Sequence, residues 1–364
     1  MMALNDWNLL HGDAHENTAN GVDSSSFSHN PLDHDQASIR LLRILPKRSE
    51  FGLIQCELIH ATVDASYTCL SYVWGPAARQ RLILINGKLF KVRENLWQFL
   101  SATCQAYQQL SSIWYWIDAL CINQENTVER NHQVAQMGTI YRGAQSMLIW
   151  MGIDESTTRL LKVALEAWRL MARCNTFSQF QDAGTQNTDI CNLQVAKDLL
   201  GFMLHVYWTR AWITQEVLLA RNIQLLTDRA SVESEQLRPI CYLRQGTWWL
   251  PMYLTGKKSG CLKGNRWDVD CQVSQHVGQR LYGANPLVKL VGGFPGHISQ
   301  IPQDQIYSLL SLADIAHKLP VDYRVPAEEF SLQLIETLHR TLCLYSLECL
   351  ANAMPSACKI CTIR

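Results

Sequence analysis

Residues 115–152 read YWIDALCINQENTVERNHQVAQMGTIYRGAQSMLIWMG and contain one complete strand–helix–strand pattern. Two short apolar runs, at residues 113–117 and 147–150, have the length and the aromatic and β-branched content of buried strands. Between them, Asn126 can cap a helix and Glu129 can close a capping box. The apolar positions that recur at helical spacing mark the buried side of this helix: Val134, Met137, Ile140 and Tyr141. We therefore expect a βαβ unit with two parallel strands and a right-handed crossover.

Alternating strand and helix patterns on either side extend this unit into a larger α/β sheet. Strands are expected at residues 67–73 and 222–227, and helices at 95–107, capped by Asn95, and around Glu216. The combined order of elements is flavodoxin-like, which predicts a mainly parallel sheet with helices on both faces. Residues 119–124, directly after the first strand of the βαβ unit, are expected to form a loop.

An N-terminal β segment precedes this core. Strands are expected at residues 39–45 and 54–59, followed by a hairpin made of residues 82–85 and 88–92. The hairpin turn is Asn86-Gly87, which suits a two-residue type I′ turn because both residues tolerate a positive φ.

The chain divides by composition into three parts. Residues 1–37 are rich in His, Asn, Asp, Ser and Gly and are expected to be a disordered leader. Residues 38–228 hold the α/β domain. Residues 229–364 are expected to be a mostly helical C-terminal extension, with helices at 302–316 and 327–345. Polar, glycine-bearing stretches are expected to be loops at residues 175–192 and 256–283.

Composition argues against several classes of function. Of the 364 residues, 48% are hydrophobic and 18% are charged, so the chain can bury a large core. The formal net charge is zero and no long basic run occurs, which argues against nucleic acid as the main partner. No stretch has the length and apolarity of a membrane span, and no signal peptide opens the chain, so the expected location is the cytoplasm.

The cysteines and histidines show no metal-ligand pattern. The thirteen cysteines are scattered, and we expect them to be reduced and mostly buried. The four leader histidines lack the spacing of a metal motif, and a single CxxC at residues 358–361 stands without partners. No metal site is therefore expected, and no cofactor is assigned.

Three blocks of sequence carry a family resemblance. WIDALCINQ, at residues 116–124, is followed by Glu129-Arg130 and IWMG; YTCLSYVWG, at 67–75, precedes it, and YWTRAWITQE, at 207–216, follows it. In this order the blocks resemble the fungal heterokaryon-incompatibility (HET) domain, with core motifs over residues 67–221. The resemblance implies a programmed-cell-death effector that works with protein partners or by self-association. It also implies a short or truncated chain, because such proteins often continue much further.

The same blocks resemble the TIR domain, a family that includes NAD-cleaving enzymes. This resemblance implies a catalytic carboxylate at Glu216, with NAD as substrate rather than as a bound cofactor. An ionised carboxylate beside the ribose would stabilise the oxocarbenium character that develops when the nicotinamide–ribose bond breaks. The residues expected to contact the substrate lie at strand ends or on the Glu216 helix: Ser71, Tyr72, Trp74, Gly75, Asp118 and Trp212.

Simpler explanations stand beside these assignments. Glu216 can pair with Arg210 or Arg221 at the surface, where an ion pair contributes little. Trp74 and Trp212 can be core aromatics.

Other polar residues of the central block have similarly simple explanations. Asp118 can cap the loop that follows it. Cys121 near His132 suggests a thiol nucleophile, but a buried structural cysteine is the favoured interpretation. Glu129 and Arg130 are expected to be surface charges of their helix.

Three classes of function therefore remain open at the level of sequence. The chain can be an enzyme that hydrolyses NAD, a non-catalytic module that nucleates a death-signalling assembly, or a hydrolase of another nucleotide glycosidic bond. Metabolite measurement in cells that express the protein separates the first class from the second, and substrate profiling of the purified domain separates the first from the third.

Overall fold

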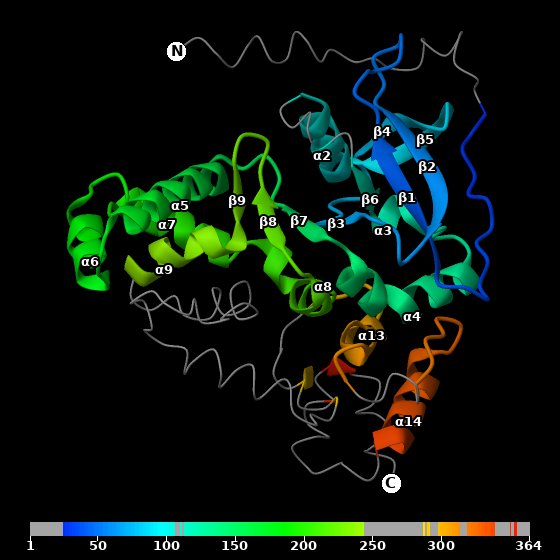
Figure 1. The fold of residues 1–364 in the computed structure, drawn as a ribbon. Coiled ribbons are helices and arrows are strands. Elements are labelled where there is room, and N and C mark those ends of the chain that lie inside the picture. The colour runs from blue at the N-terminus through cyan, green and yellow to red at the C-terminus, as the bar shows by residue number, and fades with distance from the viewer. Residues whose placement is uncertain are drawn as a thin grey trace.

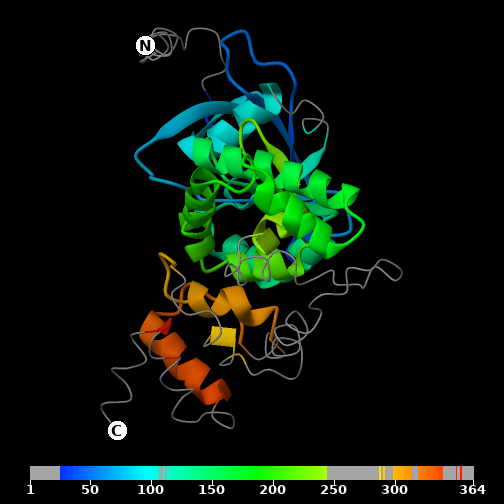
Figure 2. The same cartoon turned by 90° about the vertical axis from the view of Figure 1, so that its left-hand side faces the viewer.

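The computed structural model describes residues 25–105, 110, 113–243, 287, 290–291, 298–313, 319–338, 350 and 353–354. Within them, one large α/β body carries a nine-stranded mixed sheet, and a smaller helical unit lies beside it (Figure 1, Figure 2). The strands are β1 Ser38–Ile44, β2 Gln55–Thr62, β3 Thr68–Tyr72, β4 Gln80–Ile85, β5 Lys88–Arg93, β6 Trp114–Trp116, β7 Ser146–Trp150, β8 Ile223–Leu226 and β9 Ser231–Glu233. Their order across the sheet is β5-β4-β2-β1-β6-β3-β7-β8-β9.

Four parallel strands form the centre of this sheet. β3 pairs with β6 on one side, where Cys69 lies opposite Trp116, and with β7 on the other, where Ser71 lies opposite Ile149. β8 continues the parallel pairing beyond β7. Numbered along the chain, these four strands stand in the order 2-1-3-4, which is how a flavodoxin-like sheet begins. The predicted α/β fold with a parallel core is confirmed.

The flanks of the sheet are largely antiparallel. β1 runs antiparallel to both β2 and β6, and so attaches the N-terminal β segment to the parallel core. β4 and β5 form the predicted hairpin, in which Asn86 and Gly87 have φ values of 50° and 78°, as a type I′ turn requires. β9 closes the other edge as an antiparallel partner of β8.

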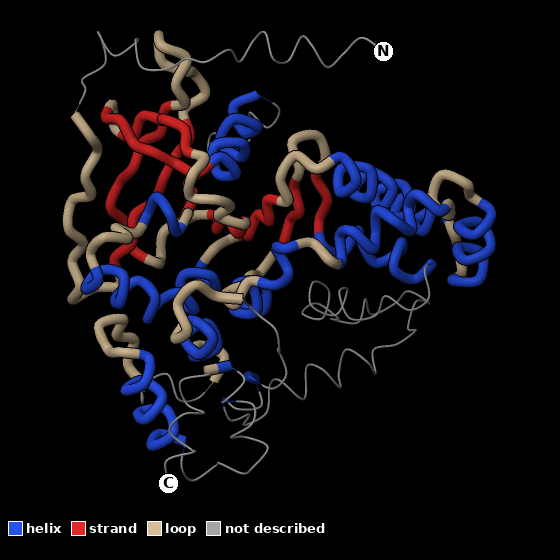
Figure 3. Tube along the Cα trace, turned by 180° about the vertical axis from the view of Figure 1, so that it is seen from behind, coloured by secondary structure: helices blue, strands red, loops and turns tan. Residues whose placement is uncertain are grey.

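Helices surround the parallel strands. Within the described residues they are α2 Glu94–Gln105, α3 Asp118–Cys121, α4 Thr127–Gly143, α5 Glu155–Arg173, α6 Phe177–Gln186, α7 Leu193–Met203, α8 Ile213–Leu219, α9 Arg238–Leu243, α13 Asp304–Leu310 and α14 Ala327–Leu338. α2 lies on one side of the central strands and α4 and α8 on the other (Figure 3). α5 packs against α6, α7 and α9 and extends the body beyond the β8–β9 edge.

Two segments expected as loops are helical. Residues 175–192 contain α6, which begins at the cap residue Thr176, whose hydroxyl accepts a hydrogen bond from the Gln179 N–H at 3.2 Å. Phe180 and Ile190 are buried, and Phe177 packs on Phe180 and Tyr242, so a few apolar residues anchor this otherwise polar stretch. Residues 119–124 likewise start inside the short helix α3.

The start of α4 follows the sequence prediction only in part. The Asn126 side chain accepts hydrogen bonds from the N–H groups of Val128 and Glu129, so Asn126 is the N-cap as predicted. The prediction of a capping box is wrong, because both carboxylate oxygens of Glu129 accept hydrogen bonds from Arg40 of β1 and not from the Asn126 N–H.

Residues 25–37 lie against the α/β body. The Phe27 N–H donates to the Leu89 carbonyl at 2.9 Å, the His29 ring bonds the Leu120 carbonyl at 2.8 Å, and Leu32 is buried. Residues 1–24 lie outside the described residues. The packed chain therefore begins before residue 38, and the division into leader, domain and extension stays a prediction.

Residues 298–313 and 319–338 form a separate group that we call the C-terminal unit. It contains α13 and α14, where helices were expected, and it has a hydrophobic cluster of its own that includes Ile306, Leu310 and Phe330. The expected loop at 256–283 and the terminal CxxC lie outside the described residues. In the part of the chain that the structure describes, no helix is long and apolar enough to cross a membrane.

Candidate functional site

Ser71 and Glu216 meet at the carboxyl end of the central strand β3. Ser71 lies near the end of β3, and α8 places Glu216 directly against it, so that the Ser71 hydroxyl donates to the Glu216 carboxylate. Both side chains are buried, and Glu216 is only 2% exposed. These residues are 145 positions apart in sequence, so the contact depends on the assembled sheet rather than on local structure.

Arg210 neutralises this carboxylate. Its Nη1 and Nη2 donate to Glu216 Oε2 and Oε1 at 3.0 and 2.9 Å, a bidentate geometry that fits a guanidinium, and Nη1 also donates to Ser71 Oγ at 3.1 Å. Burial by itself lowers the pKa of Arg210, but the adjacent Glu216 carboxylate raises it above its ordinary value. The Glu216–Arg210 pairing weighed in the sequence is therefore present, but Glu216 is buried at 2% exposure and Arg210, at 18%, is only partly exposed.

Tyr207 completes the group that we call the Arg210–Glu216 cluster: Ser71, Tyr207, Arg210 and Glu216. The Tyr207 hydroxyl lies 2.6 Å from Ser71 Oγ, and its ring centroid lies 5.5 Å from the Arg210 guanidinium carbon. Burial, assisted by the Glu216 charge, raises the pKa of Tyr207, so this phenol stays neutral. The sequence did not single out Tyr207, although the block YWTRAWITQE contains all three cluster members outside β3.

Asp118 is the more accessible carboxylate at this edge of the sheet. It follows the end of β6, where its Oδ2 accepts from the Trp74 indole at 2.9 Å and its Oδ1 accepts from the Ala119 N–H at 2.7 Å. Burial raises the pKa of Asp118 to about 6; Arg210 opposes this shift and Glu216 adds to it. Asp118 therefore lies within electrostatic range of the Arg210–Glu216 cluster. A pair of carboxylates in such different surroundings is typical of acid–base sites.

Asn95 joins the carboxyl ends of β3 and β7, where the strand order of the sheet reverses. Its amide donates to the Val73 carbonyl, and its Oδ1 accepts from the Trp150 indole at 2.9 Å. Gly75 and Gly152 lie next to it with φ values of 73° and 87°. Asn95 does not cap its helix as predicted, because α2 already begins at Glu94.

Tyr72, Trp74 and Gly75 continue this edge of the sheet. Tyr72 is buried, and burial together with the Asp118 charge raises the pKa of its phenol. The Trp74 ring is partly buried under the Arg93 guanidinium, which lies 5.1 Å from the ring centroid and donates to the Gly75 carbonyl at 2.7 Å. Of the predicted site residues, these three therefore lie at the same edge as Ser71, Asp118 and Glu216.

Trp212 lies elsewhere. It is the N-cap residue of α8, and its side chain hydrogen-bonds the carboxylate of Asp304 at the start of α13. It packs between the main core and the hydrophobic cluster of the C-terminal unit. The four-residue spacing to Glu216 therefore does not bring the indole and the carboxylate to one binding surface.

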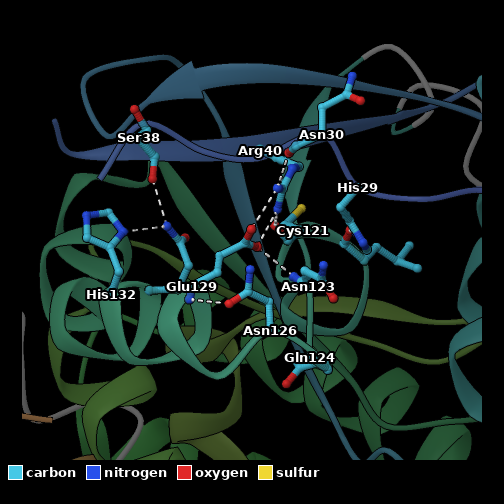
Figure 4. Close-up of polar contacts among 12 residues, drawn as sticks. His29, Asn30, Ser38, Arg40, Cys121, Asn123, Gln124, Asn126, Glu129 and His132 are labelled. Carbon is cyan, nitrogen blue, oxygen red and sulfur yellow. Dashed lines mark hydrogen bonds and ion pairs between the residues drawn. The ribbon is translucent and has the colours of Figure 1, made fainter. Parts of the chain in front are cut away.

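A second buried ion pair holds the N-terminal segment (Figure 4). Arg40 on β1 donates to both carboxylate oxygens of Glu129 on α4, at 2.6 and 2.9 Å, and the two side chains are 1% and 2% exposed. Arg40 also donates to the carbonyls of Cys121 and Asn30. Burial raises the pKa of Glu129, but the bonds from Arg40 and the Asn123 N–H outweigh it and the net shift is downward. The expectation that Glu129 is a surface charge is wrong.

Cys121 has the environment of a structural cysteine. It is fully buried, its thiol faces the Tyr115 carbonyl at 3.8 Å, and burial raises its pKa to about 12. His132 stacks on His34 instead, with ring centroids 4.7 Å apart. Across the described ranges, no group of three or more His, Cys, Asp or Glu side chains could hold a metal ion.

Comparison with known proteins agrees with the three sequence blocks. The family described as Heterokaryon incompatibility protein (HET) matches residues 67–216. Heterokaryon incompatibility protein 6, OR allele, of Neurospora crassa is 29% identical in an alignment of 157 residues that covers 39% of this chain and 23% of that protein. The chain thus matches less than a quarter of the length of that relative. No solved structure matches this chain. The matched range contains β3, the β6–α4–β7 unit and Glu216, so residues 67–216 of this chain are similar to a HET domain.

Proposed function

We propose that this chain takes part in heterokaryon incompatibility as a cell-death effector, and that it acts by hydrolysing the nicotinamide–ribose bond of NAD. The similarity to a HET domain and the name of the Neurospora crassa relative support the role. One observation supports the reaction: the Arg210–Glu216 cluster and Asp118 gather at the carboxyl ends of neighbouring parallel strands. Open α/β sheets bind their ligands at this edge.

The two carboxylates would have different tasks in this reaction. NAD carries a positive charge on its nicotinamide ring, and bond cleavage moves that charge towards the ribose carbon, where the Glu216 carboxylate stabilises it. Asp118, whose pKa is about 6, is ionised at pH 7 and accepts the proton of the attacking water. The carbon–nitrogen bond breaks with its electron pair on nicotinamide, a carbon–oxygen bond forms, and neutral nicotinamide and ADP-ribose are the products.

In the folded chain, Glu216 is not free to contact a substrate. Both of its oxygens are bound by Arg210, and the carboxylate is 2% exposed. The reaction therefore requires Arg210 to move away from Glu216. Once released, its guanidinium is suited to a phosphate group of the dinucleotide, because the same planar donors bind phosphate bidentately.

The test is incubation of the purified protein with NAD and chromatographic detection of free nicotinamide. Glu216→Gln should lower the rate by about a hundredfold or more. Glu57→Gln is the matched control, because it removes a carboxylate that is also paired with an arginine but is exposed: the side chains of Arg43 and Glu57 are 40% and 38% exposed. Circular dichroism of each variant reports on folding. A folded Glu216→Gln protein that releases nicotinamide at the wild-type rate contradicts the proposal.

A non-catalytic assembly module is the second candidate function. The observation that favours it is the complete pairing of Glu216 with Arg210 and Ser71, which is also what a purely structural ion pair shows. Expression in a fungal host distinguishes the two functions: death without loss of cellular NAD favours assembly. Profiling of other nucleotides with the purified protein then tests for a different glycosidic bond.

A further inference from the structure

The C-terminal unit contacts the backbone on both sides of Arg210. Ile298 forms a parallel β-bridge with Arg210 in which the Ala211 N–H donates to the Ile298 carbonyl at 3.1 Å and the Ile298 N–H donates to the Thr209 carbonyl at 2.5 Å. These two hydrogen bonds fix the chain immediately before and after Arg210. The direction of the Arg210 side chain therefore depends on a residue far along the sequence.

α13 holds the start of α8 at a second point. The Asp304 carboxylate accepts hydrogen bonds from the Trp212 side chain and, at 2.6 Å, from the Tyr323 hydroxyl. Tyr323 in turn lies under the Arg130 guanidinium of α4, 4.2 Å from its ring centroid. The Asn131 amide adds a 2.9 Å bond to Asp322. The C-terminal unit thus binds α4 and α8 together.

Gln215 is a third point of contact, one residue before Glu216. This side chain is 1% exposed. With its amide oriented to match its neighbours, Gln215 donates to the Ser308 carbonyl at 3.1 Å and the Ser311 hydroxyl at 2.8 Å, and accepts from the Gly138 N–H at 3.0 Å. Gly138 is necessary for this fit, since a Cβ there would lie 2.3 Å from the Ser311 Cβ.

The C-terminal unit thus contacts the chain at several points between residues 209 and 216. While these contacts are present, Glu216 is buried and its charge is neutralised by Arg210. We propose that the C-terminal unit is an autoinhibitory clamp: it keeps Arg210 on Glu216, and its release opens the cluster to substrate. The inhibitory part of this inference rests on the proposed function. The mechanical part, which concerns how firmly residues 209–219 are held, does not.

Gly138→Ala tests the clamp with a single methyl group. The new Cβ must displace Ser311 and thereby α13, whereas Ala is itself a better helix former than Gly in α4. We expect amide exchange in α8 to rise by about tenfold or more, together with a several-fold rise in nicotinamide release. Thr139→Ala, at the next and exposed position of α4, is the matched control and should change neither.

Second substitutions at position 311 show whether Gly138→Ala acts through its contact with Ser311 or by destabilising the fold in general. Gly138→Ala combined with Ser311→Gly removes the clashing Cβ and should restore much of the wild-type exchange and rate. Gly138→Ala combined with Ser311→Ala keeps the clash and should behave like Gly138→Ala alone. Asp304→Ala removes the hydrogen bond to Trp212 without adding an atom that clashes, and it should also raise amide exchange in α8.

The possible outcomes are distinct. Unchanged exchange in α8 in both Gly138→Ala and Asp304→Ala overturns the clamp. Raised exchange with an unchanged or lower rate, in a protein whose wild type releases nicotinamide, overturns autoinhibition. If no form of the protein releases nicotinamide, the proposed hydrolysis fails, and toxicity in a fungal host becomes the readout: Gly138→Ala must then kill more effectively than wild type, and equal killing overturns the clamp.

Discussion

Asp118 and Glu216 occupy the same edge of the sheet but differ in how their charge is stabilised. Glu216 receives three hydrogen bonds from Arg210 and Ser71 and is withdrawn from water. Asp118 receives one from the Trp74 indole and one from a backbone N–H, which do not outweigh its burial. A carboxylate that is costly to ionise in the folded protein reduces stability at neutral pH, and such a cost is common where a group is held for chemistry.

This difference predicts the pH dependence of an Asp118→Asn variant. The pKa of Asp118 rises from 3.8 to about 6 on folding, so its contribution to stability is fully present below pH 3.8 and is lost as the pH rises through about 6. Asn does not titrate, so the variant should gain stability relative to wild type between these pH values and keep the gain above them. Urea unfolding at pH 4 and pH 7.5 measures it, with the exposed Asp182→Asn as control. A difference between variant and wild type that is the same at both pH values contradicts the assigned shift.

The sequence could predict the residues of the site better than their contacts. Ser71, Asp118 and Glu216 were identified from three blocks, and all three lie at one edge of the sheet. Trp212 was assigned to the same surface by helical spacing, but spacing does not specify which neighbour a side chain meets, and here the neighbour is Asp304 of the C-terminal unit. Tyr207 was missed because its role depends on an approach to Ser71 across 136 positions of sequence.

At the scale of elements, a local signal was reliable where no distant side chain competed with it. The type I′ hairpin and the Asn126 cap depend on a few adjacent residues, and both are present as predicted. The capping box failed because Glu129 has a stronger partner in Arg40, 89 positions away. Asn95 is a similar case, since its side chain joins two strand ends instead of capping α2. In each case a tertiary contact replaced the local one.

The Arg40–Glu129 pair, which links β1 to α4, gives a prediction at this scale. Arg40→Met leaves the Glu129 carboxylate buried without its cation, which should cost about 3–5 kcal/mol of unfolding free energy. Combining Arg40→Met with Glu129→Leu should recover part of this loss, because no unpaired charge remains. Arg43→Met, on the same strand but with an ion pair about 40% exposed, should cost only about 0–1 kcal/mol.

Urea unfolding measures all three variants. Equal losses for Arg40→Met and Arg43→Met would show that the buried pair is no more important than the exposed one. A double variant less stable than Arg40→Met alone would show that Glu129, which also accepts a hydrogen bond from the Asn123 N–H, stabilises the fold by more than its unpaired charge costs.

At the scale of the whole molecule, the described residues form two hydrophobic clusters of unequal size. The larger fills the α/β body, and the smaller lies within the C-terminal unit. Only partly buried residues are shared between them, namely Val134, Trp212 and Leu312. The sequence indicated helices in this unit but not its docking on α4 and α8, because docking depends on single residues such as Gly138 and Gln215 that have no periodic signature.

This arrangement predicts that the molecule opens in two steps. Amide hydrogen exchange in native conditions, repeated at increasing urea, reports the free energy at which each element opens. The amides of α13 and α14 should open at a lower free energy than those of β3 and β7, because the smaller cluster and its few shared contacts stabilise the C-terminal unit less than the four parallel strands stabilise one another. Asp304→Ala should lower the first value further and leave the second unchanged, since Trp212 and Tyr323, which hydrogen-bond the Asp304 carboxylate, lie outside the parallel strands. If all four elements open at one free energy, the C-terminal unit and the α/β body are a single cooperative unit, and a clamp that releases on its own is physically ruled out.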